Sequence, residues 1–270
     1  MKIKSPYLVK PGAKIRLEDH PTDDMGSFKK EKDALAELEK HRSKLGELQE
    51  ILFADGKHAL LIVLQAMDTG GKDGTIRHIF SGVNPQGVTV TSFKVPTPLE
   101  AAHDYLWRVH AAVPRLGTIG IFNRSHYEDV LVTRVHKMIS DKVAKRRFGE
   151  INQFEEMLHS NGVTILKFFL HISQREQTAR LEARCEDKDK HYKISESDFK
   201  ERVHWGKYQE YYEEAIRATS QEHAPWFVIP ADYKWYRNAA VSRIIVEAME
   251  AMKLKYPKPN FDVAAVCGQL

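Results

Sequence analysis

The sequence predicts an α/β fold in which helices cover both faces of a parallel sheet, giving three layers. Apolar runs typical of strands alternate with segments of helical periodicity along the chain. The first expected strand, "ALLIVL" at 59–64, is continuously apolar, as expected where both faces of a sheet are buried. With 270 residues, 42% of them hydrophobic, the chain can form one large core.

Local signals place the individual elements. Leucines recur at helical spacing from Phe28 to Phe53, and Asp55-Gly56 is expected to end that helix. Five strands are expected at 59–64, 88–93, 118–122, 163–172 and 226–229. Capping boxes at Thr97 and Ser173 predict two helix starts. Further helices are expected at 72–80, from 97 through 107, and at 127–159, 174–184, 198–219 and 236–252.

The domain organisation is expected to be simple. Residues 1–27 are punctuated by Pro and Gly and are expected to form an N-terminal arm on the surface. Residues 28–270 are expected to form a single domain. That domain includes a lid at about 180–197, where the sequence is charged and poor in apolar residues.

Composition excludes several classes of protein. The formal charge is +4, from 41 basic and 37 acidic residues, so we expect no nucleic acid partner. Cys185 and Cys267 lie far apart and predict neither a metal site nor a disulfide. No segment approaches the roughly 18 apolar residues of a membrane span, and the N-terminus lacks a signal-peptide pattern. We therefore expect a cytoplasmic protein without a membrane partner.

A glycine-containing loop follows the first expected strand and leads into a helix. It resembles the phosphate-binding pattern G-x-x-x-x-G-K-[ST], but Ala66 replaces the first glycine and Asp73 the final hydroxyl residue. Backbone amides at such a helix start can face an anion, and Lys72 adds a charge. A tight turn with an exposed lysine is the alternative. The predicted phosphate-binding residues are Gly70, Gly71, Lys72, Asp73, Gly74 and Thr75.

A carboxylate beside a phosphate requires a cation between them. Since the loop lacks the hydroxyl that usually helps to hold Mg²⁺, a carboxylate is a plausible replacement. Asp68, at the end of the strand, is the first candidate ligand, and Asp73 could equally be an ordinary acidic residue of a first helical turn.

A second polar group follows the third expected strand. Arg124 is suited to bidentate phosphate contact. Asn123 and Glu128 are candidates for metal and nucleotide binding, whereas Asp129 is equally well explained as a solvated helix start. His126 is more simply explained as a packed residue than as a general base or phosphate carrier.

Basic residues elsewhere suggest contacts with a polyanion. The lid segment carries Arg180, Arg184, Lys190 and Lys193, which could close over a phosphate and neutralise developing charge. Arg77, Arg108 and Arg134 could bind a phosphate chain away from the reaction point, although each alone is more simply a surface charge. A solvated loop remains the alternative for the lid.

Five ordered blocks of this chain resemble the family-2 polyphosphate kinases from about Phe28 to Tyr256. They are "QAMDTGGKDGTIRHIFSGVNPQGV", "DYLWRVHAAVPRLG", "IFNRSHYEDVLVTRV", "EQTARLEARCEDKDKHYKISESDF" and "APWFVIPADYKWYRN". The resemblance implies a P-loop kinase-like fold with a helical lid, and phosphoryl transfer between inorganic polyphosphate and nucleotides with Mg²⁺, or Mn²⁺ in its place. It also implies a homo-oligomer.

The resemblance assigns catalytic roles to Asp68, Lys72, Arg124 and Arg184. Many members carry Asp where this chain has Asn123, and Asn where it has Glu128. That departure is similar to the subgroup that accepts both nucleoside mono- and diphosphates. The expected partners are AMP, ADP and ATP, with guanine nucleotides as further candidates.

Two other functions remain open from the residues alone. An ATP-dependent nucleoside monophosphate kinase would use the same loop and lid. A non-catalytic basic protein that binds polyanions would explain the positive charge, but not why Asp68, Lys72 and Arg124 all follow strand ends. The sequence leaves the direction of transfer, the base preference and the polyphosphate chain length open.

Overall fold

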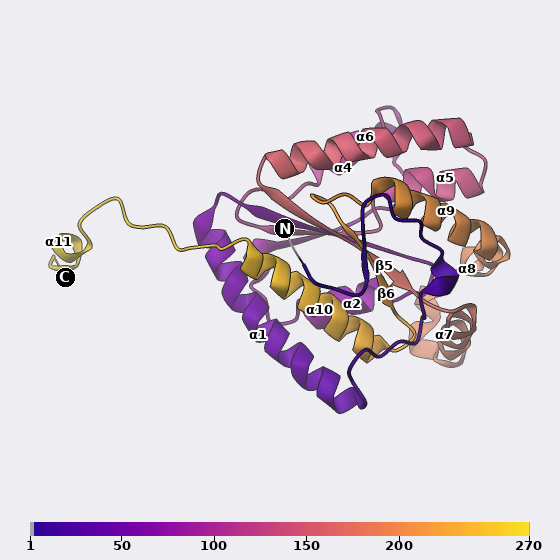
Figure 1. Ribbon diagram of the computed structural model, residues 1–270, viewed down its shortest axis with the longest axis horizontal. Coiled ribbons are helices and arrows are strands. Elements are labelled where there is room, and N and C mark those ends of the chain that lie inside the picture. The colour runs from indigo at the N-terminus through magenta and orange to yellow at the C-terminus, as the bar shows by residue number, and fades with distance from the viewer. Residues whose placement is uncertain (1–2, 270) are drawn as a thin grey trace.

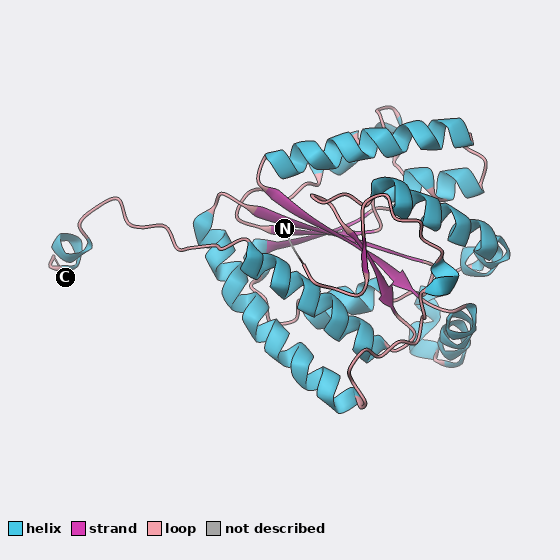
Figure 2. Ribbon diagram, in the orientation of Figure 1, coloured by secondary structure: helices cyan, strands magenta, loops and turns pink. Residues whose placement is uncertain are grey.

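The computed structural model describes residues 3–269 and contains a six-stranded sheet between two layers of helices. Figure 1 shows α1, α2 and α10 on one face of the sheet and α6 and α9 on the other, with α7 and α8 at one end. Figure 2 shows the same arrangement by element type. The predicted three-layer α/β class is therefore confirmed, with one more strand than expected.

The strand order is β1-β6-β5-β2-β4-β3, and every pairing except β1 with β6 is parallel. β2 lies at the centre, and Leu64 of β2 pairs in register with Asn123 of β4 and Phe168 of β5. The strands are β1 (Leu8–Val9), β2 (Ala59–Ala66), β3 (Val88–Ser92), β4 (Ile119–Asn123), β5 (Val163–His171) and β6 (Trp226–Pro230).

The helices have the following bounds: α1 (Glu31–Asp55), α2 (Lys72–Ile79), α3 (Pro98–Ala101), α4 (Trp107–Ala111), α5 (Val132–Val135), α6 (Asp141–Ser160), α7 (Gln174–Glu186), α8 (Glu196–Glu201), α9 (Trp205–Thr219), α10 (Lys234–Ala251) and α11 (Val263–Cys267). Short 3₁₀ segments η3 (His126–Val130), η4 (Lys188–Lys193) and η5 (Arg202–His204) lie between some of them. After α10 the chain runs away from the body and ends at α11 (Figure 1). None of the helices within 3–269 has the length and apolar character needed to cross a membrane.

The sixth strand comes from the N-terminal arm. Leu8 and Val9 pair antiparallel with Phe227 and Trp226 at the β6 edge of the sheet. Val9 and Leu17 are buried there, so the arm covers an edge that would otherwise expose unpaired backbone groups. The sequence did not predict this strand, because two residues are too few to show a periodicity.

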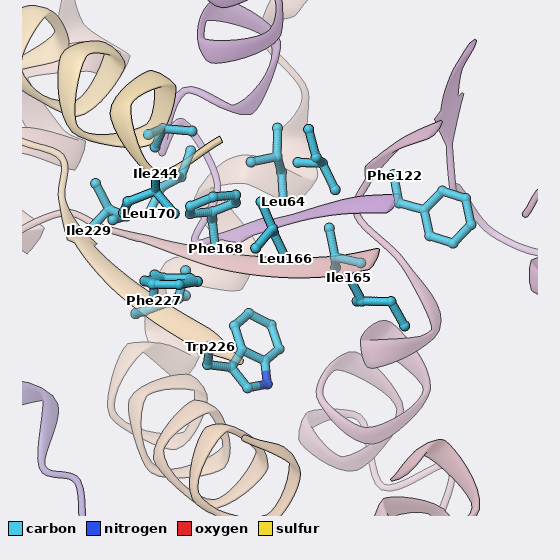
Figure 3. Packing of buried hydrophobic residues seen from close by; sticks show 14 of the residues in the cluster. Leu64, Phe122, Ile165, Leu166, Phe168, Leu170, Trp226, Phe227, Ile229 and Ile244 are labelled. Atoms are coloured by element: carbon cyan, nitrogen blue, oxygen red, sulfur yellow. The ribbon is translucent and has the colours of Figure 1, made fainter. Parts of the chain in front are cut away.

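The core surrounds the central strands. All eight residues of β2 are buried, as are the β4, β5 and β6 side chains that Figure 3 shows packing together, such as Phe168 and Trp226. Ile244 of α10 closes the core from one layer. The continuous apolar character of β2 is thus explained by burial on both faces.

Several predicted helices are shorter or interrupted. The capping box at Thr97 is present, but α3 ends at Ala101, because the Asp104 carboxylate accepts from the Leu106 amide in a turn before α4. The helix expected at 127–159 is η3, α5 and α6 in succession, and Lys137, between α5 and α6, adopts φ 56°. The helix expected at 198–219 is α8, η5 and α9 in succession.

The predicted capping box at Ser173 is only half formed. The Ser173 hydroxyl accepts from the Glu176 amide at 3.0 Å. However, the Ser173 amide donates to Asp232, and Glu176 turns instead to Arg180. Because the Ser173 amide donates to Asp232, the start of α7 is connected to the loop after β6.

Candidate active site

The loops after β2 and β4 bring the predicted phosphate-site residues together. These parallel strands are neighbours, so their carboxyl ends open at the same edge of the sheet. The chain continues from this pair toward β3 on one side and β5 on the other, which makes the edge a topological switch point, where α/β folds bind ligands. Asp68 follows β2 and Arg124 follows β4.

Arg124 joins the two candidate carboxylates. Its Nη2 donates to Asp68 Oδ1 at 2.8 Å, and its Nη1 lies 3.5 Å from Glu128 Oε2. Burial acts to lower the pKa of Arg124, but Glu128 and Asp68 hold it above the ordinary value. Burial raises the pKa of Glu128, opposed by Arg124 and Lys72. The protonation states of Arg124, Glu128 and their charged neighbours therefore depend on one another.

Lys72 is buried at the start of α2, close to the same charges. Its Nζ donates to the Ala66 carbonyl at 3.2 Å. Burial, and to a smaller degree Arg124, lowers the pKa of Lys72 to about 8, although Asp68, Glu128 and Asp73 favour the charged form. The lysine is thus an internal cation and not the exposed residue of an ordinary turn.

Steric constraints explain two of the glycines in the loop. A Cβ on Gly70 would lie 2.4 Å from the Cβ of Ala66, and a Cβ on Gly71 would lie 2.0 Å from the Arg237 guanidinium. Gly71 also has φ +97°, which disfavours any side chain. Gly74 is less constrained, because its nearest contact would be at 3.5 Å.

The start of α2 presents unpaired backbone donors. Within residues 3–269, no protein group accepts a hydrogen bond from the amides of Gly71, Lys72 and Asp73. Such amides, together with the helix dipole, favour an anion. Asp73 Oδ1 accepts from Asn123 Nδ2 at 2.6 Å, so this pair connects α2 to the end of β4.

Three consecutive carbonyls of the loop are held from behind by side chains that the sequence did not single out for this purpose. Gln177 donates to the Asp68 carbonyl at 3.1 Å, Arg180 to the Thr69 carbonyl at 3.0 Å, and Arg237 to the Gly70 carbonyl at 3.3 Å. Gln177 and Arg237 were missed. Arg237 lies in the last of the five blocks, "APWFVIPADYKWYRN", but a buried arginine has no local sequence signal.

Arg180 contacts the loop as part of the protein interior. Besides Thr69, its guanidinium donates to the carbonyls of Ala231 and Asp232 and to Glu176. It is buried in this structure, and its assignment to a mobile lid remains a prediction. Arg184, one turn later, donates to the Lys193 carbonyl at 3.3 Å. Lys190 and Lys193 are exposed on η4 beside it.

The three basic residues predicted to bind a distant part of a phosphate chain are placed apart from the loop. Arg134 is buried between Asp141 and Glu214 and stacks on Tyr211. The other two are Arg108, which donates to the Lys94 carbonyl at 2.8 Å beside Asp129, and Arg77, which is exposed in a hollow against α1. Arg134 and Arg108 face internal carboxylates here, and their assignment to a phosphate chain remains a prediction.

His126 and Asp129 do not face the site. Asp129 lies between Arg108 and Arg147. His126 is buried and contacts Glu155, which also pairs with the buried Lys167 of β5. The interpretation of His126 as a packed residue agrees with this placement, and the network anchors the segment that carries Arg124 and Glu128.

The donor set suits a hard divalent cation. Asp68, Asp73 and Glu128 supply carboxylate oxygens around Lys72 and Arg124. Within residues 3–269, no three or more His, Cys, Asp or Glu side chains form a ready-made metal cluster. Mg²⁺ usually takes one or two carboxylates and completes its octahedron with water and phosphate oxygens, so these residues fit that ion.

A phosphate loop at a switch point, with an internal lysine, an arginine and carboxylates, defines a phosphoryl-transfer enzyme of the P-loop kinase-like class. The family model described as Polyphosphate kinase 2 (PPK2) matches residues 28–257. The chain belongs to the polyphosphate kinase 2 family, and it is a kinase.

Relatives match along nearly the whole chain. The AMP/ADP-polyphosphate phosphotransferase of Meiothermus ruber is 52% identical over 94% of this chain and 96% of its own length. The ADP-polyphosphate phosphotransferase of Rhodopseudomonas palustris is 42% identical over 96% of this chain and 94% of its own. The crystal structure of polyphosphate kinase 2 from Arthrobacter aurescens has a TM-score of 0.93 at 42% identity, covering 96% of this chain and 94% of the other.

Proposed function

We propose that this enzyme transfers the terminal phosphoryl group of inorganic polyphosphate to AMP and ADP, making ADP and ATP, and catalyses the reverse reaction. The observation that carries the proposal is the contact of Asp68 with Arg124 beside Lys72, at the ends of adjacent strands. The names of the Meiothermus ruber and Rhodopseudomonas palustris relatives support the choice of polyphosphate and adenine nucleotides.

The reaction requires positioning and charge neutralisation more than covalent chemistry. A bond forms between an acceptor phosphate oxygen and the terminal phosphorus. At the same time the bond from that phosphorus to the bridging oxygen breaks, and the shortened chain leaves with the electron pair. The acceptor oxygen is already ionised near neutral pH, so no general base is required.

Each polar residue of the site has a role in this proposal. Lys72 and the amides at the start of α2 hold the transferring phosphate, and Arg124 orients the acceptor phosphate. Asp68, with Glu128, would hold Mg²⁺, which when bound supplies neutralisation of the phosphate oxygens. Asn123 positions Asp73 through the 2.6 Å contact of its amide nitrogen, and its amide oxygen remains a candidate metal ligand. Arg184 is the lid residue that closes over the donor.

An assay without ATP tests this function. Protein, Mg²⁺, polyphosphate and either AMP or ADP are mixed, and the nucleotides are separated by chromatography. New ADP or ATP is the expected result. Absence of product with polyphosphate, together with ADP formation from ATP and AMP, would contradict the proposal in favour of an ATP-dependent nucleoside monophosphate kinase. Binding of polyphosphate without turnover would favour the non-catalytic alternative.

A further inference from the structure

Arg237 is the most deeply enclosed cation near the phosphate loop. It lies in the first turn of α10 with 2% of its surface exposed. Its hydrogen-bond acceptors are the Gly70 carbonyl at 3.3 Å and Asn238 Oδ1 at 2.9 and 3.2 Å, and all of these are neutral. Burial and the neighbouring Arg180 lower the pKa of Arg237.

The charged protein groups close to Arg237 do not neutralise its positive charge. Arg180 is within electrostatic reach, and Lys234 is perturbed by both arginines. Glu176 is the carboxylate that pairs with Arg180, at 2.7 Å. A buried cation without a paired anion destabilises a folded protein, and a bound negative group would offset this cost.

The position of Arg237 shows where that negative group would be. The guanidinium lies directly behind Gly71, where an added Cβ would meet Nη1 at 2.0 Å. The amides of Gly71 and Lys72 lie in the same stretch of loop and have no protein acceptor within residues 3–269. An anion bound by these amides would lie at the segment of the loop that Arg237 contacts.

We propose that Arg237 is a positioning residue. Its positive charge is balanced by polyphosphate bound at the start of α2, next to the loop that Arg237 holds. The Gly70 carbonyl is held by Arg237, which fixes the orientation of the peptide unit that leads to Gly71. Because a bound phosphate chain balances the charge of Arg237, the loop is most ordered and most stable when the chain is present. This inference rests on the proposed function, because it takes polyphosphate as the ligand.

Two variants separate the charge from the hydrogen bond. Arg237→Gln loses the charge and ends two bonds short of the arginine Nη1 that contacts the Gly70 carbonyl, whereas Arg237→Lys keeps the charge and loses the fork. Arg243→Met is the matched control, since Arg243 lies on the same helix and pairs with Glu37 at a distance from the loop. The dissociation constant of tripolyphosphate is measured by calorimetry with Mg²⁺, and melting temperatures are measured with and without tripolyphosphate.

The dissociation constant should rise at least about tenfold in Arg237→Gln and less than about threefold in Arg237→Lys and the control, as expected for a charge-assisted contribution. The KM for polyphosphate should rise in Arg237→Gln while the KM for AMP stays constant. The rise in melting temperature on adding tripolyphosphate should also be smaller.

Unchanged tripolyphosphate affinity in Arg237→Gln would overturn the proposal, as would equal losses in Arg237→Gln and Arg237→Lys, because the latter indicates a purely geometric clamp. If Arg237→Gln does not fold, Arg237→Lys decides, and a tenfold loss there overturns the proposal. Wild-type protein that binds tripolyphosphate in an Arg237-dependent way without turnover would defeat only the proposed function.

Discussion

Arg124 donates to Asp68 at 2.8 Å and lies 3.5 Å from Glu128, so one guanidinium connects the carboxylates that follow two neighbouring strands. The positions of these carboxylates are therefore fixed relative to each other and to Lys72. This relationship is the basis for assigning phosphate and metal chemistry to the edge of the sheet where β2 and β4 end.

Glu128→Gln tests whether the second carboxylate takes part in metal binding. We expect kcat/KM for polyphosphate to fall at least about tenfold and the Mg²⁺ concentration at half-maximal rate to rise, on the scale seen when metal-site groups are replaced. Asp129→Asn is the matched control, because Asp129 faces Arg108 and Arg147 instead. An unchanged Mg²⁺ dependence in Glu128→Gln would exclude Glu128 as a metal ligand.

The lowered pKa of Lys72 predicts a pH dependence. The free enzyme loses this cation as pH rises through about 8, so kcat/KM for polyphosphate should fall above that pH. Lys72→Arg should remove this fall from the remaining activity. Since the unfolded chain keeps the proton up to about 10.5, the Lys72 contribution to the free energy of unfolding should rise between pH 8 and 10.5. Measured pKa values typically scatter by ~1 unit. If kcat/KM for polyphosphate stayed constant up to about pH 9.5, beyond that scatter, the lowered pKa of Lys72 would be contradicted.

The loop glycines should differ in their tolerance of alanine. Gly71→Ala places a Cβ 2.0 Å from Arg237 at φ +97°, so we expect loss of more than about 2 kcal/mol of stability together with activity. Gly74→Ala meets nothing closer than 3.5 Å inside α2 and should stabilise by about 0.5–1 kcal/mol. Denaturant unfolding measures both. Equal effects would show that the steric distinction is wrong.

Arg180 and Arg184 lie one turn apart on α7 but should behave differently. Arg180→Ala leaves the carbonyls of Thr69, Ala231 and Asp232 without a donor, so unfolding free energy should fall by about 2–4 kcal/mol. Arg184→Ala should leave stability within about 0.5 kcal/mol and lower kcat. Unfolding curves and initial rates of both variants provide the measurements, and a stable Arg180→Ala protein would restore Arg180 as a lid residue.

The sequence predicted what depends on local pattern. A continuous apolar run identified β2, and the loop after β2 identified Asp68 and Lys72, because a strand, a glycine loop and a helix follow each other directly in the chain. Because the carboxyl ends of parallel strands lie at one edge of the sheet, the sequence also placed Arg124 near Asp68. In the structure Arg124 donates a hydrogen bond to Asp68.

What the sequence missed depends on contacts between distant segments. Arg180 was assigned to a mobile lid because a charged stretch follows it, yet the Ala231 and Asp232 carbonyls fix it. Arg134 was assigned to polyphosphate, yet Asp141 and Glu214 neutralise it. A basic residue looks the same in sequence whether its partner is a ligand or an internal carboxylate.

The most direct test of the central claim is the initial rate of ADP formation from AMP and polyphosphate, without ATP, for wild type and Asp68→Asn over a range of Mg²⁺ concentrations. The wild type should form ADP with a saturable Mg²⁺ dependence. Asp68→Asn should fold and lose at least about 10²-fold in rate at every Mg²⁺ concentration, the scale of a lost preorganised charge. A rate for Asp68→Asn close to that of the wild type would contradict the assignment of this loop as the reaction centre.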